Sequence, residues 1–357
     1  MKYTRDRTRI VKIGDIEIGG GKTVAVQSMA KTATTDVSGV LGQIERAHNA
    51  GCDIFRVSVP DMDSARSLGE IVKNSPIPIV ADIHFDYKLA LASIEAGVHK
   101  LRINPGNIGS PERVKIVANE AMARNIPIRI GVNAGSLPKD IFEKYGKPCA
   151  DAMVESAERE INILREVGFE NIVVSLKSSS PQITLEANLK FSQKYDYPLH
   201  IGVTESGFGV QGIVASTVGM TTILSAGIGD TIRVSLTEPP ENEVRVAREI
   251  LRFLGLRKYW VRLVSCPTCA RCEVDLPEIA RKVWDNIKHL KNDITVAVMG
   301  CVVNGPGEAS DADIGVACGK SSGIIFKNGR QISKIRDDEI VSSLLSGIDD
   351  LLKGISN

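Results

Sequence analysis

The chain has 357 residues, of which 43% are hydrophobic and 24% are charged, and its formal net charge is +1. This composition predicts a folded protein with one large domain and a smaller one. It excludes a global electric field that would recruit nucleic acid or an acidic membrane. Because the N-terminus has no apolar signal core and no stretch of about 18 apolar residues occurs, we expect a cytoplasmic protein.

Eight short segments rich in valine and isoleucine recur along the first two thirds of the chain, separated by stretches of helix length. They are residues 24–29, 54–59, 77–83, 100–104, 128–133, 171–177, 199–205 and 231–236. Nearly continuous apolar strands that alternate with helices indicate a parallel sheet covered on both faces. Eight such units match the size of a (β/α)8 TIM barrel. The stretch 10–23 predicts a hairpin ahead of the first strand, which we expect to close the barrel floor.

The pattern changes near residue 259. Strand-like segments at 259–266, 294–301 and 313–320 alternate with helical patterns at 275–290 and 337–354, and Asn328-Gly329 predicts a tight hairpin turn. We therefore predict two domains in an α/β chain. Residues 1–258 form the TIM-barrel domain with its N-terminal hairpin, and residues 259–357 form a smaller α+β domain.

Polar residues stand at the carboxyl ends of the predicted barrel strands, where this fold carries its chemistry. Spacings of two or four residues keep those of one strand on the same face. The candidates are Arg56, Asp82, His84, Arg102, Arg129, Asn133, Lys177, Glu205, Arg233 and Ser235. The glycines of the loop 207–212 predict a further anion site at the same end of the barrel.

Five of these candidates are cations and only two are strong acids, Asp82 and Glu205. Converging cations cannot be left unpaired in a partly desolvated cavity. A diphosphate or a comparable polyanion would neutralise them, and the arginine fork suits phosphate oxygens. The alternative is that each cation makes an ordinary ion pair. Asp82, His84 and Glu205 are the titratable candidates for proton transfer.

Cysteines cluster in the smaller domain. Cys266, Cys269 and Cys272 are two residues apart, and Cys301 follows in a glycine-rich loop. In a reducing compartment such clustering favours metal binding over disulfides. The spacing is nearer to iron–sulfur usage than to structural zinc, which pairs a C-x2-C with a second cysteine or histidine pair. A zinc-bound interaction module is a further alternative, but no basic stripe or aromatic platform supports it.

Two stretches, CPTCAR (266–271) and MGCVVNGPGEA (299–309), closely resemble the 4-hydroxy-3-methylbut-2-enyl diphosphate synthase family of the non-mevalonate isoprenoid pathway, in its compact bacterial form. The likeness covers nearly the whole chain, through VADIHFD, LRINPGN, IRIGVN, VSLKSS, GVTESG and GDTIRVSL. It implies an iron–sulfur oxidoreductase that opens the ring of 2-C-methyl-D-erythritol 2,4-cyclodiphosphate and dehydrates it to 4-hydroxy-3-methylbut-2-enyl diphosphate. Two electrons would arrive through a [4Fe–4S] cluster in the smaller domain.

The resemblance also implies roles for residues and partners. Cluster ligands would be Cys266, Cys269, Cys301 and Glu308. Substrate would be bound by Arg56, Arg102, Arg129, Asn133, Lys177, Arg233 and Ser235. Glu205 would be the proton donor or hydrogen-bond partner at the leaving hydroxyl. Reduced ferredoxin or flavodoxin would donate the electrons. In a homodimer, the cluster domain of one chain would cover the barrel of the other.

Cys272 departs from the family, which commonly has a non-ligating residue there. An all-cysteine site with Cys272 in place of Glu308 is therefore a rival arrangement. The alternative activity is a non-redox barrel lyase or synthase that acts on a phosphorylated substrate and carries structural zinc.

Overall fold

The computed structural model describes residues 5–103, 108, 110–258, 260–301, 307 and 309–355. The chain divides into two compact units, Met1–Arg257 and Lys258–Asn357. The expected boundary between residues 258 and 259 lies one residue from this division. Within these ranges, none of the helices combines the length and the apolar character that a membrane span requires.

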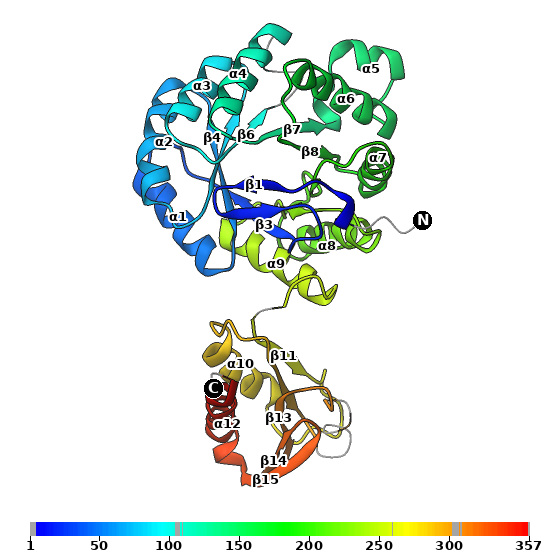
Figure 1. Ribbon diagram of the computed structural model, residues 1–357. Helices are drawn as coiled ribbons and strands as arrows, with labels where there is room; N and C mark the ends of the chain where they lie inside the picture. The colour runs from blue at the N-terminus through cyan, green and yellow to red at the C-terminus, as the bar shows by residue number, and fades with distance from the viewer. Residues whose placement is uncertain are drawn as a thin grey trace. The chain divides into compact units, whose positions relative to one another are not determined.

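A parallel sheet of eight strands forms the centre of the first unit (Figure 1). The strands are β3 (Ala25–Met29), β4 (Ile54–Val59), β5 (Ile79–Ile83), β6 (Lys100–Ile103), β7 (Ile128–Asn133), β8 (Ile172–Lys177), β9 (His200–Ile201) and β10 (Thr231–Ile232). Their spatial order is β8-β7-β6-β5-β4-β3-β10-β9, and a parallel bridge between Val174 and Leu199 joins the two ends. The predicted (β/α)8 barrel is confirmed.

The last two strands are shorter than predicted. β9 ends at Ile201 and β10 at Ile232, so Glu205, Arg233 and Ser235 lie on the loops that follow. Gly202 follows β9 directly, and a Cβ there would come within 2.6 Å of the Arg233 carbonyl oxygen, so only glycine fits at this position.

Helices cover the outside of the barrel, where they bury the apolar side chains that the strands direct outward. They are α1 (Val37–Asn49), α2 (Met62–Asn74), α3 (Tyr87–Glu95), α4 (Pro111–Ala123), α5 (Lys139–Tyr145), α6 (Ala150–Glu166), α7 (Pro181–Lys194), α8 (Gly209–Ser225) and α9 (Pro240–Phe253). A hairpin of β1 (Val11–Ile13) and β2 (Ile16–Ile18) packs Val11, Ile13 and Ile18 against residues near the starts of four barrel strands. The hairpin therefore covers the amino end of the barrel, and the carboxyl ends of the strands form the opposite end, called the mouth below.

The second unit has a five-stranded sheet in the order β11-β12-β13-β14-β15. Its elements are β11 (Arg262–Ser265), α10 (Leu276–Ile287), β12 (Thr295–Met299), β13 (Ile314–Gly319), β14 (Ser322–Lys327), β15 (Arg330–Arg336) and α12 (Ile340–Ile355). Alternate residues of β12 face opposite sides, since Val296 and Val298 pack with α10 and α12 while Ala297 and Met299 pack elsewhere. Asn328 and Gly329 both have positive φ, as the predicted hairpin turn requires.

Glu160 is a buried acid in α6 that lies away from the barrel mouth. Its side chain is 5% exposed, and Oε2 has no hydrogen-bond partner among the described residues. Burial raises the pKa of Glu160 from 4.5 to about 7, although Arg159 opposes the shift. Because the folded pKa is raised, the stability contributed by the protonated carboxyl is present below pH 4.5 and is lost as the pH rises through 7.

Glu160→Gln is therefore expected to raise the free energy of unfolding by about 2 kcal/mol at pH 8 and by much less at pH 5. Urea unfolding at the two pH values measures this. Glu166→Gln on the same helix is the control, because Glu166 forms an exposed ion pair with Lys115 and such pairs contribute little. An equal gain for Glu160→Gln at both pH values would contradict the explanation.

Candidate active site

Three neighbouring strands bring Arg56, Asp82 and Arg102 together at the barrel mouth. Arg102 Nη1 donates to Asp82 Oδ1 at 2.8 Å, and Arg56 Nε lies 3.7 Å from Asp82 Oδ2. Burial works to raise the pKa of Asp82, but the two guanidinium groups hold it at about 2. Asp82 is thus ionised at neutral pH, which favours an anchoring role over proton donation. Gly131 leaves the space that Arg102 occupies, since a Cβ there would lie 2.6 Å from Arg102 Nε.

Arg129 on β7 is the largest fully buried side chain of the chain's described part. Its Nη1 donates to Ser175 Oγ at 3.1 Å, while Nε and Nη2 have no partner among the described residues. Burial lowers the pKa of Arg129 well below its usual value, and Arg56 and Arg102 lower it further. A guanidinium nevertheless keeps its proton at neutral pH. Arg129 is therefore a buried cation that forms no ion pair with any described residue.

Lys177 ends β8 beside Arg129 and is 6% exposed. It makes no hydrogen bond or ion pair with any residue that the structure describes. Burial lowers the pKa of Lys177 well below its usual value, and repulsion from Arg129 and Arg56 adds to the effect. Gly202 again provides the room, because a Cβ there would lie 2.9 Å from Lys177 Nζ. An anion bound here would raise the pKa of the amine and so favour its charged form.

A deeper polar layer was not found from the sequence. Lys100 and His200 are completely buried inside the barrel, with Lys100 Nζ 3.5 Å from Gln27 Oε1 and His200 Nδ1 2.6 Å from Thr231 Oγ1. Burial lowers the pKa of both side chains well below their usual values. The available signal was spacing, because Lys100 stands two residues before Arg102 and so shares its face.

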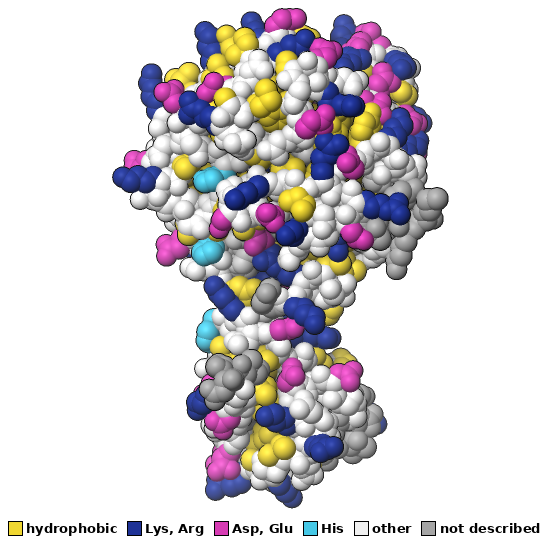
Figure 2. Space-filling model, viewed as in Figure 1, with side chains coloured by type: hydrophobic (Ala, Val, Ile, Leu, Met, Phe, Trp, Pro, Cys, Tyr) yellow, Lys and Arg dark blue, Asp and Glu magenta, His cyan; other side chains and the backbone are white. Residues whose placement is uncertain are grey.

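The cations of the mouth outnumber its buried carboxylates. The second carboxylate is Glu243 of α9, also missed from the sequence, which lies 3.4 Å from Arg233. The cationic set is Arg56, Lys100, Arg102, Arg129, Lys177 and Arg233, against Asp82 and Glu243. On the face shown in Figure 2, by contrast, basic and acidic side chains are interspersed over the barrel unit. Five of the six cations of the mouth, all but Arg233, are buried.

The remaining candidates differ in how closely they join this cluster. His84 Nε2 lies 3.1 Å from Arg102 Nη1 and accepts its hydrogen bond, so the neutral ring carries its proton on Nδ1. Burial lowers the pKa of His84, although Asp82 opposes this. Asn133 and Ser235 are half-buried at the rim. Glu205 is exposed in a left-handed conformation with φ of 58° and contacts none of these side chains through a hydrogen bond in the described structure.

The glycine-rich stretch 207–212, predicted as a loop, runs into the first turn of α8, which begins at Gly209. The Gly209 amide donates to Glu238 Oε1 at 2.8 Å. A carboxylate of the chain itself thus occupies the position that the sequence predicted for a bound anion.

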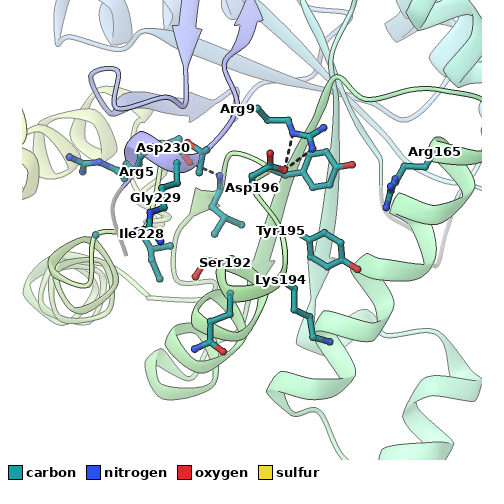
Figure 3. Close-up of a pocket in the computed structure, with 16 residues that line it drawn as sticks. Arg5, Arg9, Arg165, Ser192, Lys194, Tyr195, Asp196, Ile228, Gly229 and Asp230 are labelled. Carbon is teal, nitrogen blue, oxygen red and sulfur yellow. Dashed lines mark hydrogen bonds and ion pairs between the residues drawn. The ribbon is translucent and has the colours of Figure 1, made fainter. Parts of the chain in front are cut away.

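A cavity of about 540 Å³ opens at the amino end of the barrel (Figure 3). Arg9, Arg165 and Lys194 line it together with Tyr195 and Tyr197. These three cations already have carboxylate partners, namely Glu170 and Asp196 for Arg9, Glu170 for Arg165 and Glu158 for Lys194. Their charge is balanced, unlike that of the mouth.

In the second unit, Cys266 and Cys301 follow β11 and β12, which are parallel neighbours. The Gly300 amide donates to Cys266 Sγ at 3.3 Å. A Cβ at Gly300 would lie 2.7 Å from Cys272 Sγ and 3.3 Å from Cys266 Sγ, so glycine alone leaves these sulfurs their space. Cys272 donates to the Val274 carbonyl at 3.3 Å, and Cys269 is exposed.

Glu308 lies outside the described residues. Among the residues that are described, no three His, Cys, Asp or Glu side chains are arranged to hold a metal ion. The predicted ligand set therefore remains a prediction.

Comparison with known proteins finds two family domains in this chain. The GcpE TIM-barrel domain matches residues 8–248, and the GcpE protein C-terminal domain matches residues 262–350. The chain is 52% identical to 4-hydroxy-3-methylbut-2-en-1-yl diphosphate synthase (flavodoxin) of Clostridium acetobutylicum, over 97% of this chain and 99% of the relative. It is 53% identical to the enzyme of the same name from Thermodesulfovibrio yellowstonii, over 96% and 99%.

A solved dihydropteroate synthase from Yersinia pestis shares the barrel fold. Its TM-score is 0.50 at 11% identity, and the match covers 70% of this chain and 100% of that one. The fold likeness covers only part of the chain, whereas the family domains and the relatives extend over both units. The chain belongs to the GcpE family.

Proposed function

We propose that the chain converts 2-C-methyl-D-erythritol 2,4-cyclodiphosphate reductively to 4-hydroxy-3-methylbut-2-enyl diphosphate. The observation that carries this is the excess of buried cations at the barrel mouth, above all Arg129 and Lys177, neither of which forms an ion pair with a described residue. A cyclic diphosphate supplies two negative charges and several acceptor oxygens to such a site. Relatives about half identical over nearly their whole length bear the name of this enzyme.

The chain's own side chains would bind and orient this substrate. Arg56, Arg102, Arg129, Lys177 and Arg233 would neutralise the diphosphate, while Asn133 and Ser235 at the rim would hydrogen-bond the polar groups of the carbon skeleton. Asp82 holds Arg56 and Arg102 in place before substrate arrives. Because these groups are fixed in advance, little reorganisation would accompany binding.

The reaction takes up two electrons, opens the ring at the bond to the diphosphate and releases the tertiary hydroxyl as water, so that hydroxyl needs a proton. Glu205 is the proposed donor, with His84 and Asp82 as neighbouring polar groups. The exposed position of Glu205 on the loop after β9 requires that loop to close over the substrate.

Glu205→Gln is expected to lower kcat by about 100-fold or more, which is the usual worth of a positioned general acid. Because glutamine keeps the shape of the side chain, the dissociation constant of the substrate should stay within a few-fold of the wild-type value. Anaerobic steady-state kinetics and calorimetric binding measure the two quantities. Normal turnover by Glu205→Gln would show that another group delivers the proton.

The residues of the second unit fit an iron–sulfur cluster. Thiolates are its usual ligands, and Gly300 combines an amide directed at Cys266 Sγ with a position where any Cβ would collide with sulfur. Amide hydrogen bonds to sulfur are one way a protein adjusts such a cluster. Cys266, Cys269, Cys301 and Glu308 would hold a [4Fe–4S] cluster, with Cys272 outside the ligand set. When bound, this group would supply the two electrons and a Lewis-acidic iron for the leaving oxygen.

Reduced flavodoxin is the proposed electron donor, and ferredoxin could serve the same step, because both are small one-electron carriers. The printed names of the relatives include flavodoxin. A non-redox lyase with structural zinc needs no electron carrier, so that alternative is not favoured.

A homodimer is proposed, in which the cluster-bearing unit of one chain covers the barrel of its partner. An exposed apolar stripe on α8 supports association between copies. Its members are Phe208, Val210, Ile213, Val214 and Val218, which are 37–78% exposed. Such contiguous apolar surface is unusual on a monomer and is typical of an interface.

Val214→Asp is therefore expected to shift the chain from dimer to monomer at micromolar concentration, since it places a charge in the middle of the stripe. Analytical ultracentrifugation measures the molecular mass. Ile332→Asp, at an exposed position on β15, is the control and should leave the mass unchanged. A Val214→Asp protein that stays dimeric would place the interface elsewhere.

The experiment that tests the function is anaerobic turnover. The purified chain, reconstituted with iron and sulfide and supplied with reduced flavodoxin, should form 4-hydroxy-3-methylbut-2-enyl diphosphate with two electrons consumed per product. Cluster-loaded protein that binds the cyclic diphosphate but forms no product would overturn the proposal.

A further inference from the structure

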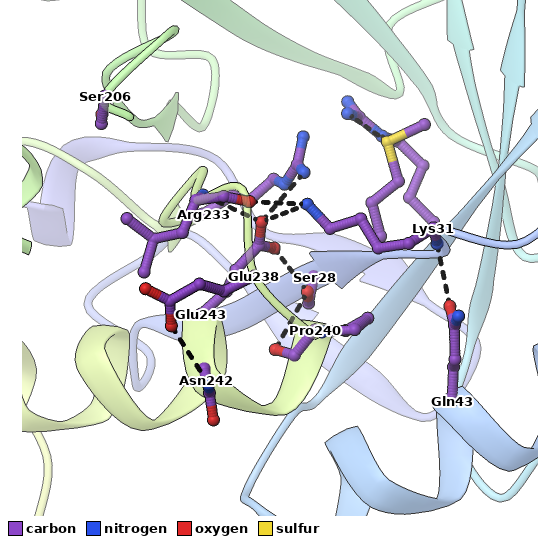
Figure 4. Close-up of polar contacts among 12 residues, drawn as sticks. Ser28, Lys31, Gln43, Ser206, Arg233, Glu238, Pro240, Asn242 and Glu243 are labelled. Carbon is purple, nitrogen blue, oxygen red and sulfur yellow. Dashed lines mark hydrogen bonds and ion pairs between the residues drawn. The ribbon is translucent and has the colours of Figure 1, made fainter. Parts of the chain in front are cut away.

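Glu243, in the first turn of α9, connects two parts of the barrel mouth. It is 1% exposed and accepts hydrogen bonds from Ser28 Oγ at 2.8 Å, Lys31 Nζ at 2.7 Å and the Leu236 amide at 3.1 Å (Figure 4). Arg233 Nη2 lies 3.4 Å from the same carboxylate. A buried carboxylate is tolerated only with such partners.

The position of Glu243 follows from the local sequence. α9 begins at Pro240, with a proline in its first turn, which is a favoured place for that residue. The helix lies against β3, and β3 pairs with β10 at Ala25 and Val26. Glu243 therefore reaches the end of β3, which carries Ser28, and the loop after β10, which carries Arg233 and Leu236.

Lys31 comes two residues after β3 ends and was not among the predicted site residues. Its ammonium also donates to the Leu236 carbonyl at 2.9 Å, and its side chain is 34% exposed. Lys31 Nζ and Arg233 Nη2 share a single carboxylate oxygen, Glu243 Oε1. Two cations thus depend on one negative charge, and Arg233 Nε has no partner among the described residues.

We propose that Glu243 is a positioning residue that holds Lys31 beside Arg233, so that Lys31 is a further substrate-contacting cation at the mouth. The inference rests on the proposed function, because the anionic oxygens of the substrate supply the second negative charge that the pair lacks. Lys31 lies on the loop after β3 and would add a seventh cation to the set. None of the other six comes from β3.

The competing explanation is that the Lys31–Glu243 pair only ties the loop after β3 to α9. Such a structural link would affect unfolding but not affinity for an anion. Lys22 and Glu17 provide a matched comparison, since they form a lysine–glutamate pair of 2.8 Å in the N-terminal region, with both side chains about half exposed.

The test measures dissociation constants of the cyclic diphosphate and of inorganic pyrophosphate by calorimetry on anaerobic, cluster-loaded protein. Lys31→Met is expected to weaken both affinities about 10-fold, with a weaker dependence on salt, and to raise KM more than it lowers kcat. Glu243→Gln should weaken binding at least as much, and adding Lys31→Met to it should cost less than Lys31→Met alone. Lys22→Met should bind both anions as the wild type does.

Unchanged affinity in Lys31→Met, with a lowered unfolding temperature, would overturn the inference in favour of a structural link. Because Lys31 is partly exposed, this variant keeps the test decisive even where Glu243→Gln fails to fold. If the wild type binds pyrophosphate but not the cyclic diphosphate, the proposed substrate is wrong, and the Lys31→Met comparison with pyrophosphate still decides the inference. A wild type that binds neither anion would contradict both.

Discussion

Replacing Arg129 by methionine is expected to weaken substrate binding by on the order of 100- to 1000-fold while making the substrate-free protein more stable. The two effects have one cause. Arg129 is 1% exposed, and two of its three guanidinium nitrogens have no partner in the described structure. Methionine fills a similar volume without a buried charge, which should raise the free energy of unfolding by about 1–3 kcal/mol. Ser175 loses one partner but still donates to the Ile130 carbonyl at 3.3 Å.

Calorimetric titration with the cyclic diphosphate and urea unfolding without ligand measure the two effects. Arg66→Met is the control, because Arg66 is an exposed arginine paired with Asp63 on α2, and both quantities should stay at their wild-type values. If Arg129→Met were less stable and bound substrate normally, Arg129 would be a structural residue and the anion site would lie elsewhere.

The second large effect concerns the cluster ligands. Cys266→Ala is expected to lose nearly all iron, because it removes a proposed ligand whose sulfur accepts a hydrogen bond from the Gly300 amide. Glu308→Ala should keep most of the iron but lose turnover by about 100-fold or more, since a carboxylate is the exchangeable ligand through which substrate oxygen would gain access to iron. Cys272→Ala should resemble the wild type, because the Cys272 thiol already donates to the Val274 carbonyl.

Iron and acid-labile sulfide per chain, measured beside turnover, distinguish these variants. Cys318→Ala provides a control for packing, since Cys318 is a fully buried cysteine of β13 whose pKa burial raises to about 12. Loss of iron in Cys272→Ala would instead favour the all-cysteine site, which would be saturated and suited to electron transfer alone.

The sequence predicted most of the barrel mouth because a parallel barrel places the carboxyl ends of all its strands at one end. Asp82 and Arg102 come together for that reason, in neighbouring strands and in register. Lys100 was missed because it lies at the start of β6, whereas the candidates were sought at the carboxyl ends of the strands. Its spacing of two residues from Arg102 nevertheless directs its side chain to the same face. Glu243 was missed because it lies on a helix, and only the tertiary structure brings that helix under the mouth.

Two predicted features depend on contacts that the sequence alone does not determine. Glu205 stands in a loop whose left-handed backbone leaves its side chain exposed, so its proposed role requires closure around substrate. The cysteine spacing indicated a metal group, but spacing does not tell a ligand from a neighbour. In the structure, Cys266 and Cys272 both approach Gly300, and the Gly300 amide donates to Cys266 Sγ while Cys272 donates to the Val274 carbonyl. Which of the two is a ligand stays a prediction.

The central claim is that the cation-lined barrel binds a substrate which an iron–sulfur cluster reduces. Its most direct test is metal analysis of the chain purified without oxygen. The account predicts about four irons and four acid-labile sulfides per chain, with a brown chromophore that dithionite bleaches. Stoichiometric zinc after anaerobic preparation, with no turnover after reconstitution with iron and sulfide, would contradict it and restore the non-redox lyase.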